Sequence, residues 1–104
     1  MSHLSASRLT FKDSWGEMSE ADQLAEQVAA LEIVAACGGE VKAQYLLTGE
    51  ECLFSVVEYP NEDAALKSAA AIGLRGVFTL TTQRAITIDE YLGMADEIRT
   101  LAGK

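Results

Sequence analysis

Two strand-like runs joined by a short polar connection constrain the fold of this chain more than any other feature. Polar and apolar residues alternate from Glu40 to Thr48, and Val and Phe are frequent from Cys52 to Tyr59, which is typical of β-strands. The connection Gly49-Glu50 suits a tight turn with glycine at its first central position. We therefore expect an antiparallel hairpin with three facing pairs: Leu47 and Cys52, Leu46 and Leu53, and Gln44 and Ser55.

Helical segments flank this hairpin in the sequence. The segment Lys12 to Met18 is expected to be a loop, and Ser19, with an acid three residues later, resembles a capping box. Apolar residues then recur at helical spacing until Gly38-Gly39 ends the helix: Leu24, Val28, Leu31 and Val34. Pro60 ends the hairpin, and Asn61 can cap an alanine-rich helix that is able to sit close to a sheet.

Strand signals outside this region complete one domain. Leu4 to Phe11 is a weaker candidate strand, and Val77 to Ala85 is a stronger one. Thr87 and Glu90 form a capping box for a last helix with an apolar stripe: Ile88, Leu92, Ala95, Ile98 and Ala102. The order β-α-β-β-α-β, with an added C-terminal helix, predicts a single α+β domain over residues 1–104. We expect a split βαβ, or ferredoxin-like, fold whose four-stranded antiparallel sheet has helices on one face.

The opposite face of the predicted sheet then needs a cover. We assign the face that carries Tyr45 and Phe54 to the helices. The remaining face has an apolar patch, and its members are the predicted interface: Leu46, Leu53 and Val57, with Tyr59 beside them. Exposed patches mark interfaces, so we expect a second copy of the chain to cover this one. A solvated face is the alternative, and a shift of one residue would exchange the two faces.

Charge and length exclude several partners. The chain has 16 acidic and 8 basic residues, a formal net charge of −8, and its basic residues are scattered. Nucleic acids and anionic membrane surfaces require clustered Lys and Arg, so neither is expected as a partner. The longest apolar run, about Ala69 to Leu74, is far shorter than the ~20 residues of a membrane span. The N-terminus has no signal-peptide pattern, and a cytoplasmic location is expected.

One stretch resembles a known family. Residues 47–60, LTGEECLFSVVEYP, resemble the centre of the GYD-domain proteins, with three residues at matching places: Gly49, Glu58 and Pro60. The segments 13–16 and 82–87 are also similar, and the resemblance covers roughly residues 9–94. Glu51-Cys52 stands where the family has Tyr-Asp. The resemblance implies a homodimer of the dimeric α/β-barrel superfamily, whose two sheets close on each other, and it implies no established activity.

Few residues suit catalysis or metal binding. His3 is the single histidine and lies near the terminus, which argues against a His-dependent triad, a His-rich metal site and a haem ligand. We therefore expect neither metal nor cofactor. Cys37 and Cys52 do not form a CxxC pair and are expected to be small buried hydrophobes.

Six residues are candidates for binding a small molecule: Gln44, Tyr45, Glu58, Tyr59, Arg84 and Trp15. A buried Glu58 would need a partner such as Arg84 or a raised pKa, and Arg84 could instead hold an anionic ligand. Trp15 and Tyr59 are able to line a pocket mouth, although plain packing is the alternative.

Three functions remain open at this point. The first is a ligand-binding or interaction module whose facing sheets enclose a cavity. The second is a cofactor-independent enzyme, such as a small oxygenase or isomerase, which predicts an enclosed cavity with a titratable residue facing it. The third is a structural domain, which predicts an interior filled by side chains. Fold analogy alone does not choose between them.

Overall fold

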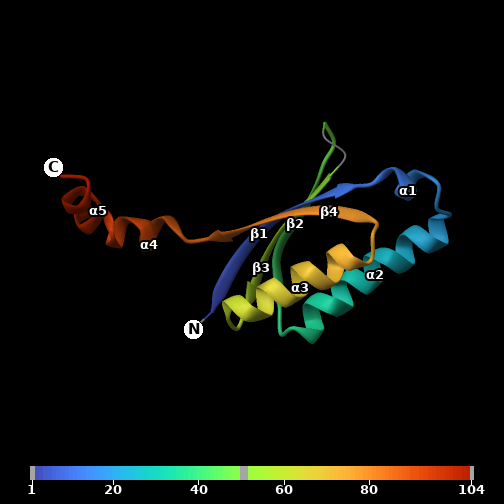
Figure 1. Cartoon of the computed structure of the whole chain (residues 1–104), viewed down its shortest axis with the longest axis horizontal. Helices are drawn as coiled ribbons and strands as arrows, with labels where there is room; N and C mark the ends of the chain where they lie inside the picture. Colours follow the sequence, from blue (N-terminus) through green and yellow to red (C-terminus); the bar gives the residue numbers. More distant parts are fainter. Residues whose placement is uncertain (1, 50–51, 104) are drawn as a thin grey trace.

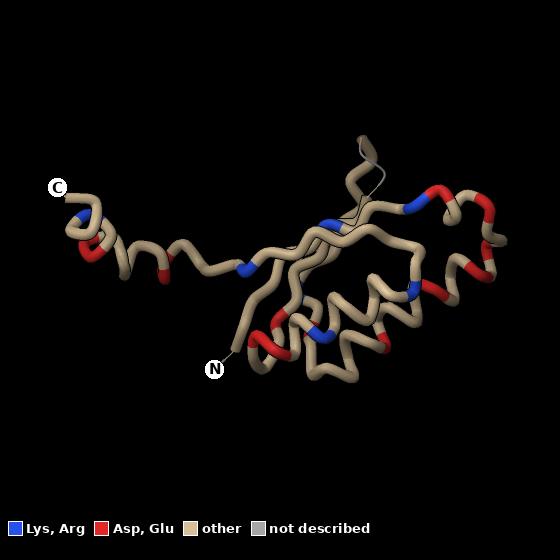
Figure 2. The backbone as a smooth tube through the Cα atoms, in the orientation of Figure 1, with Lys and Arg blue, Asp and Glu red and all other residues tan. Residues whose placement is uncertain are grey.

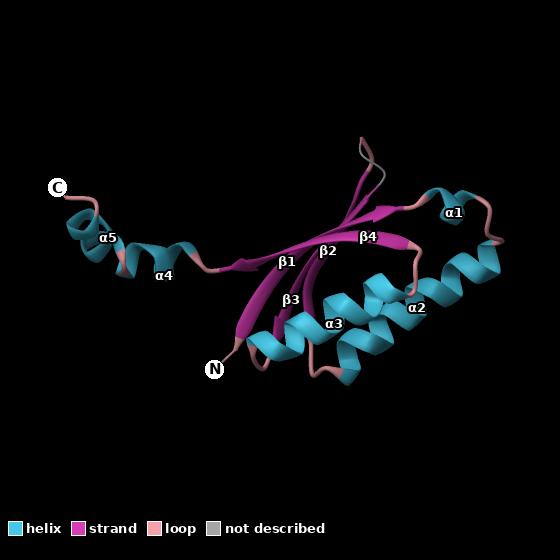
Figure 3. Cartoon of the chain, in the orientation of Figure 1, coloured by secondary structure: helices cyan, strands magenta, loops and turns pink. Residues whose placement is uncertain are grey.

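The computed structural model describes residues 2–49 and 52–103 of the 104-residue chain. It is a four-stranded antiparallel sheet with two long helices on one face (Figures 1 and 3). The elements are β1 (His3–Phe11), α1 (Asp13–Gly16), α2 (Glu20–Ala36), β2 (Glu40–Leu47), β3 (Cys52–Tyr59), α3 (Glu62–Leu74), β4 (Phe78–Ala85), α4 (Ile88–Gly93) and α5 (Ala95–Leu101). The predicted order of the four strands and the two long helices is confirmed, whereas α1 and the division of the last helix were not predicted. The chain is therefore an α+β, ferredoxin-like domain.

The strand order is β2-β3-β1-β4, so β2 and β4 are the edges of the sheet. The three predicted hairpin pairs are confirmed: Leu47 with Cys52, Leu46 with Leu53, and Gln44 with Ser55. The predicted turn falls partly on Glu50, which with Glu51 lies outside the described residues. The register shifts between Val41 and Ala43, an irregularity typical of an edge strand.

Local signals explain where the two long helices begin. The Ser19 side chain accepts a hydrogen bond of 3.1 Å from the Asp22 amide, and Asn61 accepts one of 2.8 Å from the Ala64 amide. Both predicted caps are therefore confirmed. After α2, Gly38 has φ 76°, a left-handed conformation that glycine adopts without a steric penalty. The segment 12–18, expected to be a loop, contains the short helix α1.

The assignment of the two sheet faces was wrong. Val57 and Tyr59, each 6% exposed, belong to a core with Val34, Ala65 and Ile72 of the helices, and Leu53 packs against it. Because side chains alternate along a strand, Phe54 and Val56 point to the face without helices. The predicted interface residues Leu53 and Val57 therefore lie under the helices, and Val57 is not available to a partner. Both faces of this hairpin carry apolar side chains, so the alternation of polar and apolar residues could not show which face the helices cover.

The C-terminal region differs from the single helix that was predicted. Two short helices, α4 and α5, meet at Met94, directly after Gly93, and the predicted capping box of Thr87 and Glu90 is confirmed. A glycine in a helix interior costs about 1 kcal/mol relative to alanine, which favours a break here. The two helices follow one another and extend beyond the sheet (Figure 1), and the molecule measures 56 × 30 × 20 Å. Within the described residues, no helix combines the length and apolar character that crossing a membrane requires.

Candidate ligand-binding cleft

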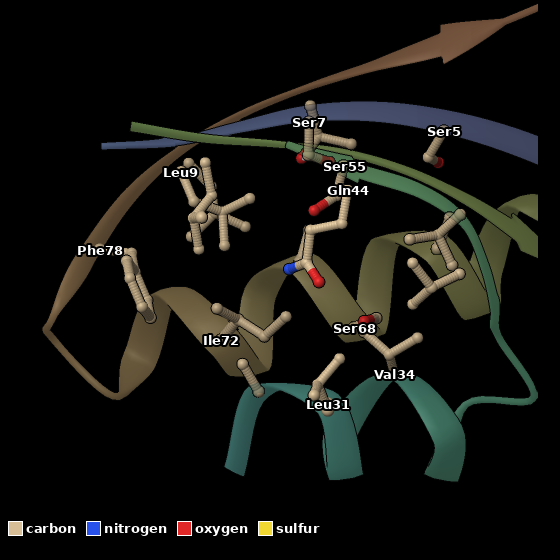
Figure 4. Close-up of a pocket in the computed structure, with 18 of the residues that line it drawn as sticks. Ser5, Ser7, Leu9, Leu31, Val34, Gln44, Ser55, Ser68, Ile72 and Phe78 are labelled. Atoms are coloured by element: carbon tan, nitrogen blue, oxygen red, sulfur yellow. The ribbon is translucent and has the colours of Figure 1, made fainter. Parts of the chain in front are cut away.

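A cavity of about 260 Å³ lies between the sheet and the two long helices (Figure 4). It arises because α3 lies against β1, β3 and β4, whereas α2 packs on α3 and not closely on β2. Small α3 residues face the cavity and leave space: Ala65, Ser68 and Ala69. Most of the exposed lining residues come from α2 and the edge strand β2, so the mouth of this cleft lies between these two elements.

An ion pair holds α2 on α3. The Arg75 guanidinium donates two hydrogen bonds of 2.8 Å to the carboxylate of Glu26. This hydrogen bonding lowers the pKa of the Glu26 carboxyl and raises that of Arg75. The pair joins the C-terminal end of α3 to the first half of α2, and so it helps to keep α2 away from β2.

The floor of the cleft is unusually rich in hydroxyl groups. Ser5, Ser7 and Ser55 project from the two central strands, and the Gln44 amide projects from β2 (Figure 4). The Ser7 hydroxyl lies 3.0 Å from that of Thr82. Ser5 is only 2% exposed, and its Oγ has no hydrogen-bond partner in the described part of the chain. An unsatisfied buried polar group costs about 1–3 kcal/mol, so this hydroxyl is a strong candidate for a ligand contact.

Tyr59 lies deep in the cleft and has its own partner. Its hydroxyl donates a hydrogen bond of 2.8 Å to the Ser68 Oγ, and both side chains are buried. Burial raises the pKa of the Tyr59 phenol, so the side chain stays neutral. Gly39 makes room for the ring, because a Cβ atom there would lie 2.7 Å from both Tyr59 and Val34.

Three of the six predicted binding residues line the cleft: Gln44, Tyr45 and Tyr59. Glu58 does not, because it lies on the uncovered face, where its carboxylate is 3.6 Å from Lys42. Lys42 also lies 3.2 Å from Glu40, and these contacts raise the pKa of the lysine. Arg84 faces Ser5 across the β1–β4 pair, so it lies on the face opposite Glu58, and the suggested pairing of the two is not made.

Trp15 packs rather than lining the cleft. Its ring stacks on Phe11 at a centroid distance of 4.6 Å and lies 5.4 Å from Phe78. It borders a separate shallow depression beside Leu46. Of the two free cysteines, Cys52 is buried as predicted, and Cys37 is half-buried.

Sequence reasoning missed the serines. Serine has no strong strand preference, so Ser5 and Ser7 weaken the strand signal of Leu4 to Phe11, yet their two-residue spacing places both on one face. Small hydroxyls alternating in a central strand are the signal that could have identified the cleft. Ser68, a single hydroxyl within an alanine-rich helix, gives a similar signal.

None of the described residues that line the cleft has a charged side chain. The Lys and Arg residues are instead spread singly over the molecule (Figure 2). Within residues 2–49 and 52–103, no group of three His, Cys, Asp or Glu side chains is placed to hold a metal ion.

The fold and the cleft together define a ferredoxin-like domain with a neutral, hydroxyl-lined interior site. The family model of the GYD domain matches residues 6–95, and the chain belongs to this family. The resemblance seen in the sequence is thereby confirmed. Among solved structures, the chain is similar to Rv0793 from Mycobacterium tuberculosis, with 13% identity, a TM-score of 0.47, and coverage of 84% of this chain and 97% of that one. Comparison with curated proteins gave no match.

Proposed function

We propose that this GYD-domain protein binds a small, neutral and largely apolar molecule in the cleft between its sheet and α2. The observation that carries the proposal is the buried Ser5 hydroxyl, which faces the cavity without a partner. A cavity of 150 Å³ holds benzene, so about 260 Å³ suits a molecule of on the order of ten non-hydrogen atoms.

The lining indicates the chemistry of the ligand. A charged ligand would lose its hydration without gaining a counter-charge, which is costly in an apolar site. Ser5 and Ser55 offer hydroxyls, and the Gln44 amide offers both a donor and an acceptor. Leu9, Ile72 and Leu80 supply apolar walls. The ligand therefore combines an apolar body with a carbonyl or hydroxyl group.

Binding is better supported than catalysis. The alternative, a cofactor-independent oxygenase or isomerase, depends on a titratable residue inside the cavity. Tyr59 lies there, but burial raises its pKa and so opposes ionisation, and its hydroxyl is occupied in a hydrogen bond to Ser68. Glu58, the candidate base, lies on the other side of the sheet.

The proposal includes a homodimer, now based on the other face of the sheet. No long helix covers the face that carries Phe54 and Val56 (Figure 3), and Leu4 and Ala6 lie on it in the neighbouring strand. Two such faces can pack at about 10 Å, as in other sheet pairs. This uncovered apolar face supports a second copy of the chain as the partner.

A thermal-shift screen tests the binding proposal. The panel consists of neutral alcohols, phenols, ketones and lactones of about ten non-hydrogen atoms. A ligand at 100 times its dissociation constant adds about 2.7 kcal/mol to the free energy of unfolding.

Replacing either of two neighbouring alanines of α3 by leucine gives a test variant and its matched control. Ala69→Leu fills the cleft and should abolish the shift, whereas Ala70→Leu, at an exposed position outside the lining, should retain it. A panel without any shift, or equal shifts in the two variants, would contradict the proposal.

A further inference from the structure

Strongly exposed large apolar side chains gather in two regions of the molecule. One is the segment 86–101, which we call the C-terminal arm, and its exposed members include Ile88, Tyr91, Leu92, Met94, Ile98 and Leu101. The other is the mouth of the cleft, where Leu31 of α2 and Val41 and Leu46 of β2 line the cavity and are exposed; Leu24 and Val28 are exposed on the same helix. Exposed apolar patches of this kind mark interaction surfaces.

Within the described residues, the C-terminal arm makes no extensive contact with the sheet or the two long helices. Helices α4 and α5 follow one another directly and project past the end of the sheet (Figure 1). They contain six and seven residues, and isolated helices of this length are marginal in water. A helical arm that exposes its apolar residues therefore needs a partner surface to be stable.

The cleft mouth is incomplete in one copy of the chain. Leu31 and Leu46 line the cavity and are also exposed at its rim, with Leu46 57% exposed. A ligand in the cleft would remain open to water on this side. An apolar cover over the rim would complete the wall of the site.

The sheet topology indicates which arm supplies the cover. The arm continues from β4 at one edge of the sheet, whereas the mouth lies beside β2 at the opposite edge. In one copy, the arm and the mouth therefore lie at opposite edges of the sheet. A two-fold axis that brings the β4 edge of one copy beside the β2 edge of another places each arm next to the other's mouth.

We propose that the C-terminal arm of one copy packs across the cleft mouth of a second copy and closes its ligand site. The proposal rests on the proposed binding function and deepens it, because each site is then built from two chains. Burying one large apolar side chain removes on the order of 100 Å² from water, so six give about 600 Å² for each arm. With the rim surface that they cover, two reciprocal arms reach the area of a standard dimer interface.

Disulfide trapping between differently tagged full-length chains tests the contact. One chain carries Leu92→Cys in the arm and the other carries Leu46→Cys at the rim. The control pair combines Leu92→Cys with Leu66→Cys, since Leu66 is 67% exposed on α3 and lies outside both surfaces. We expect at least a tenfold higher yield of the mixed disulfide with Leu46→Cys than with Leu66→Cys. Equal yields would overturn the proposal.

A chain that carries both Leu46→Cys and Leu92→Cys distinguishes exchange from self-closure. Exchange predicts disulfide-linked dimers, and a monomer with an internal disulfide would show that the arm closes its own cleft and would overturn the proposal. The unsubstituted chain gives the background from Cys37, because Cys52 is buried.

Charge substitutions give a second, independent measurement. Leu92→Asp with Ile98→Asp should raise the dimer dissociation constant at least tenfold and speed release of a ligand found in the screen. Leu66→Asp with Leu74→Asp, on the exposed side of α3, is the control and should change neither. Because the arm does not pack on the sheet, loss of folding is not expected.

The outcomes separate the two proposals. If the arm variants dimerise and release ligand as the unsubstituted chain does, only the arm contact fails, and the sheet face accounts for the dimer. If the mixed disulfide forms but no molecule of the panel binds, the arm contact stands and the binding function fails.

Discussion

The two halves of the layer between the sheet and the helices are packed very differently. Over β1 and β4, Phe78 and Ile72 belong to the core beneath α3 and also form the inner wall of the cleft. Over β2, Leu31 and Leu46 border an open cleft, and α2 is held by its contacts with α3. The buried inner wall contributes to stability and the exposed rim contributes little, so substitutions at the rim should affect ligand binding without loss of folding.

The largest expected difference is between core truncation and rim truncation. Phe78→Ala should lower the free energy of unfolding by about 3–5 kcal/mol, because it removes a buried aromatic ring and leaves a cavity. Leu31→Ala, at the exposed rim, should cost less than about 1 kcal/mol. Urea unfolding measures both. Similar costs would show that the cleft half is as tightly packed as the other.

A smaller change in the free energy of unfolding is expected at Gly39, where the backbone passes close to Tyr59. Gly39→Ala places a Cβ atom 2.7 Å from Tyr59 and Val34, and overpacking of this kind costs about 1–3 kcal/mol. Gly73→Ala, within α3 and with nothing within 4 Å of the added atom, should stabilise the protein by about 0.5–1 kcal/mol. Opposite signs in thermal unfolding are the expected result, and destabilisation by both changes would contradict it.

Tyr59 tests the polar part of the same wall. Tyr59→Phe leaves the Ser68 hydroxyl buried without its donor and should cost about 1–2 kcal/mol. Adding Ser68→Ala should recover part of this loss, because the unpaired group is then removed. A double-variant cycle in urea measures the coupling, and strictly additive effects would show that the hydrogen bond contributes nothing.

The pH dependence of stability follows from the same residue. Burial raises the pKa of Tyr59 in the folded protein above its ordinary value of 10.0, so the unfolded chain loses the phenolic proton first. The associated stability is fully present below pH 10.0 and is lost as the pH rises through the higher, folded-state value. Tyr59→Phe should remove this part of the alkaline loss in unfolding experiments. An identical alkaline profile in both proteins would argue against it.

The smallest expected effect is that of salt on the association of two copies. Each chain carries a formal net charge of −8, so association brings like charges together. Raising sodium chloride from about 20 mM to about 500 mM shortens the screening length and should strengthen dimerisation by a few-fold. Sedimentation measures the change. Weaker association in high salt would indicate contacts between opposite charges instead of apolar ones.

Much of the fold could be predicted because its signals are local. Ser19, Asn61 and Thr87 each satisfy free amides at a helix start, and the hairpin pairs follow from strand alternation and a short turn. The choice of face is different, because it depends on the distant helices. Leu53 and Phe54 are both apolar, and only contact with Ile72 and its neighbours distinguishes their sides.

The site could be predicted only in part, because it too depends on how distant elements pack. Gln44 and Tyr59 were found because polar and aromatic residues stand out in an apolar strand. The cleft itself depends on the distance between α2 and β2, which no residue in either segment specifies alone. Leu24 and Val28 fit a helix stripe that is normally buried, yet the structure exposes both. Their exposure cannot be predicted from the helix stripe, because it depends on how α2 packs on α3.

One substitution tests the central claim, that the cleft holds a hydroxyl kept for a ligand, most directly. The free energy of unfolding of Ser5→Ala should be measured alone and with a ligand from the screen, beside Ser7→Ala, whose hydroxyl already has Thr82 as a partner. The account predicts that Ser5→Ala is about 1 kcal/mol more stable than the unsubstituted chain without ligand, yet binds the ligand about tenfold more weakly. A less stable variant with unchanged affinity would contradict it.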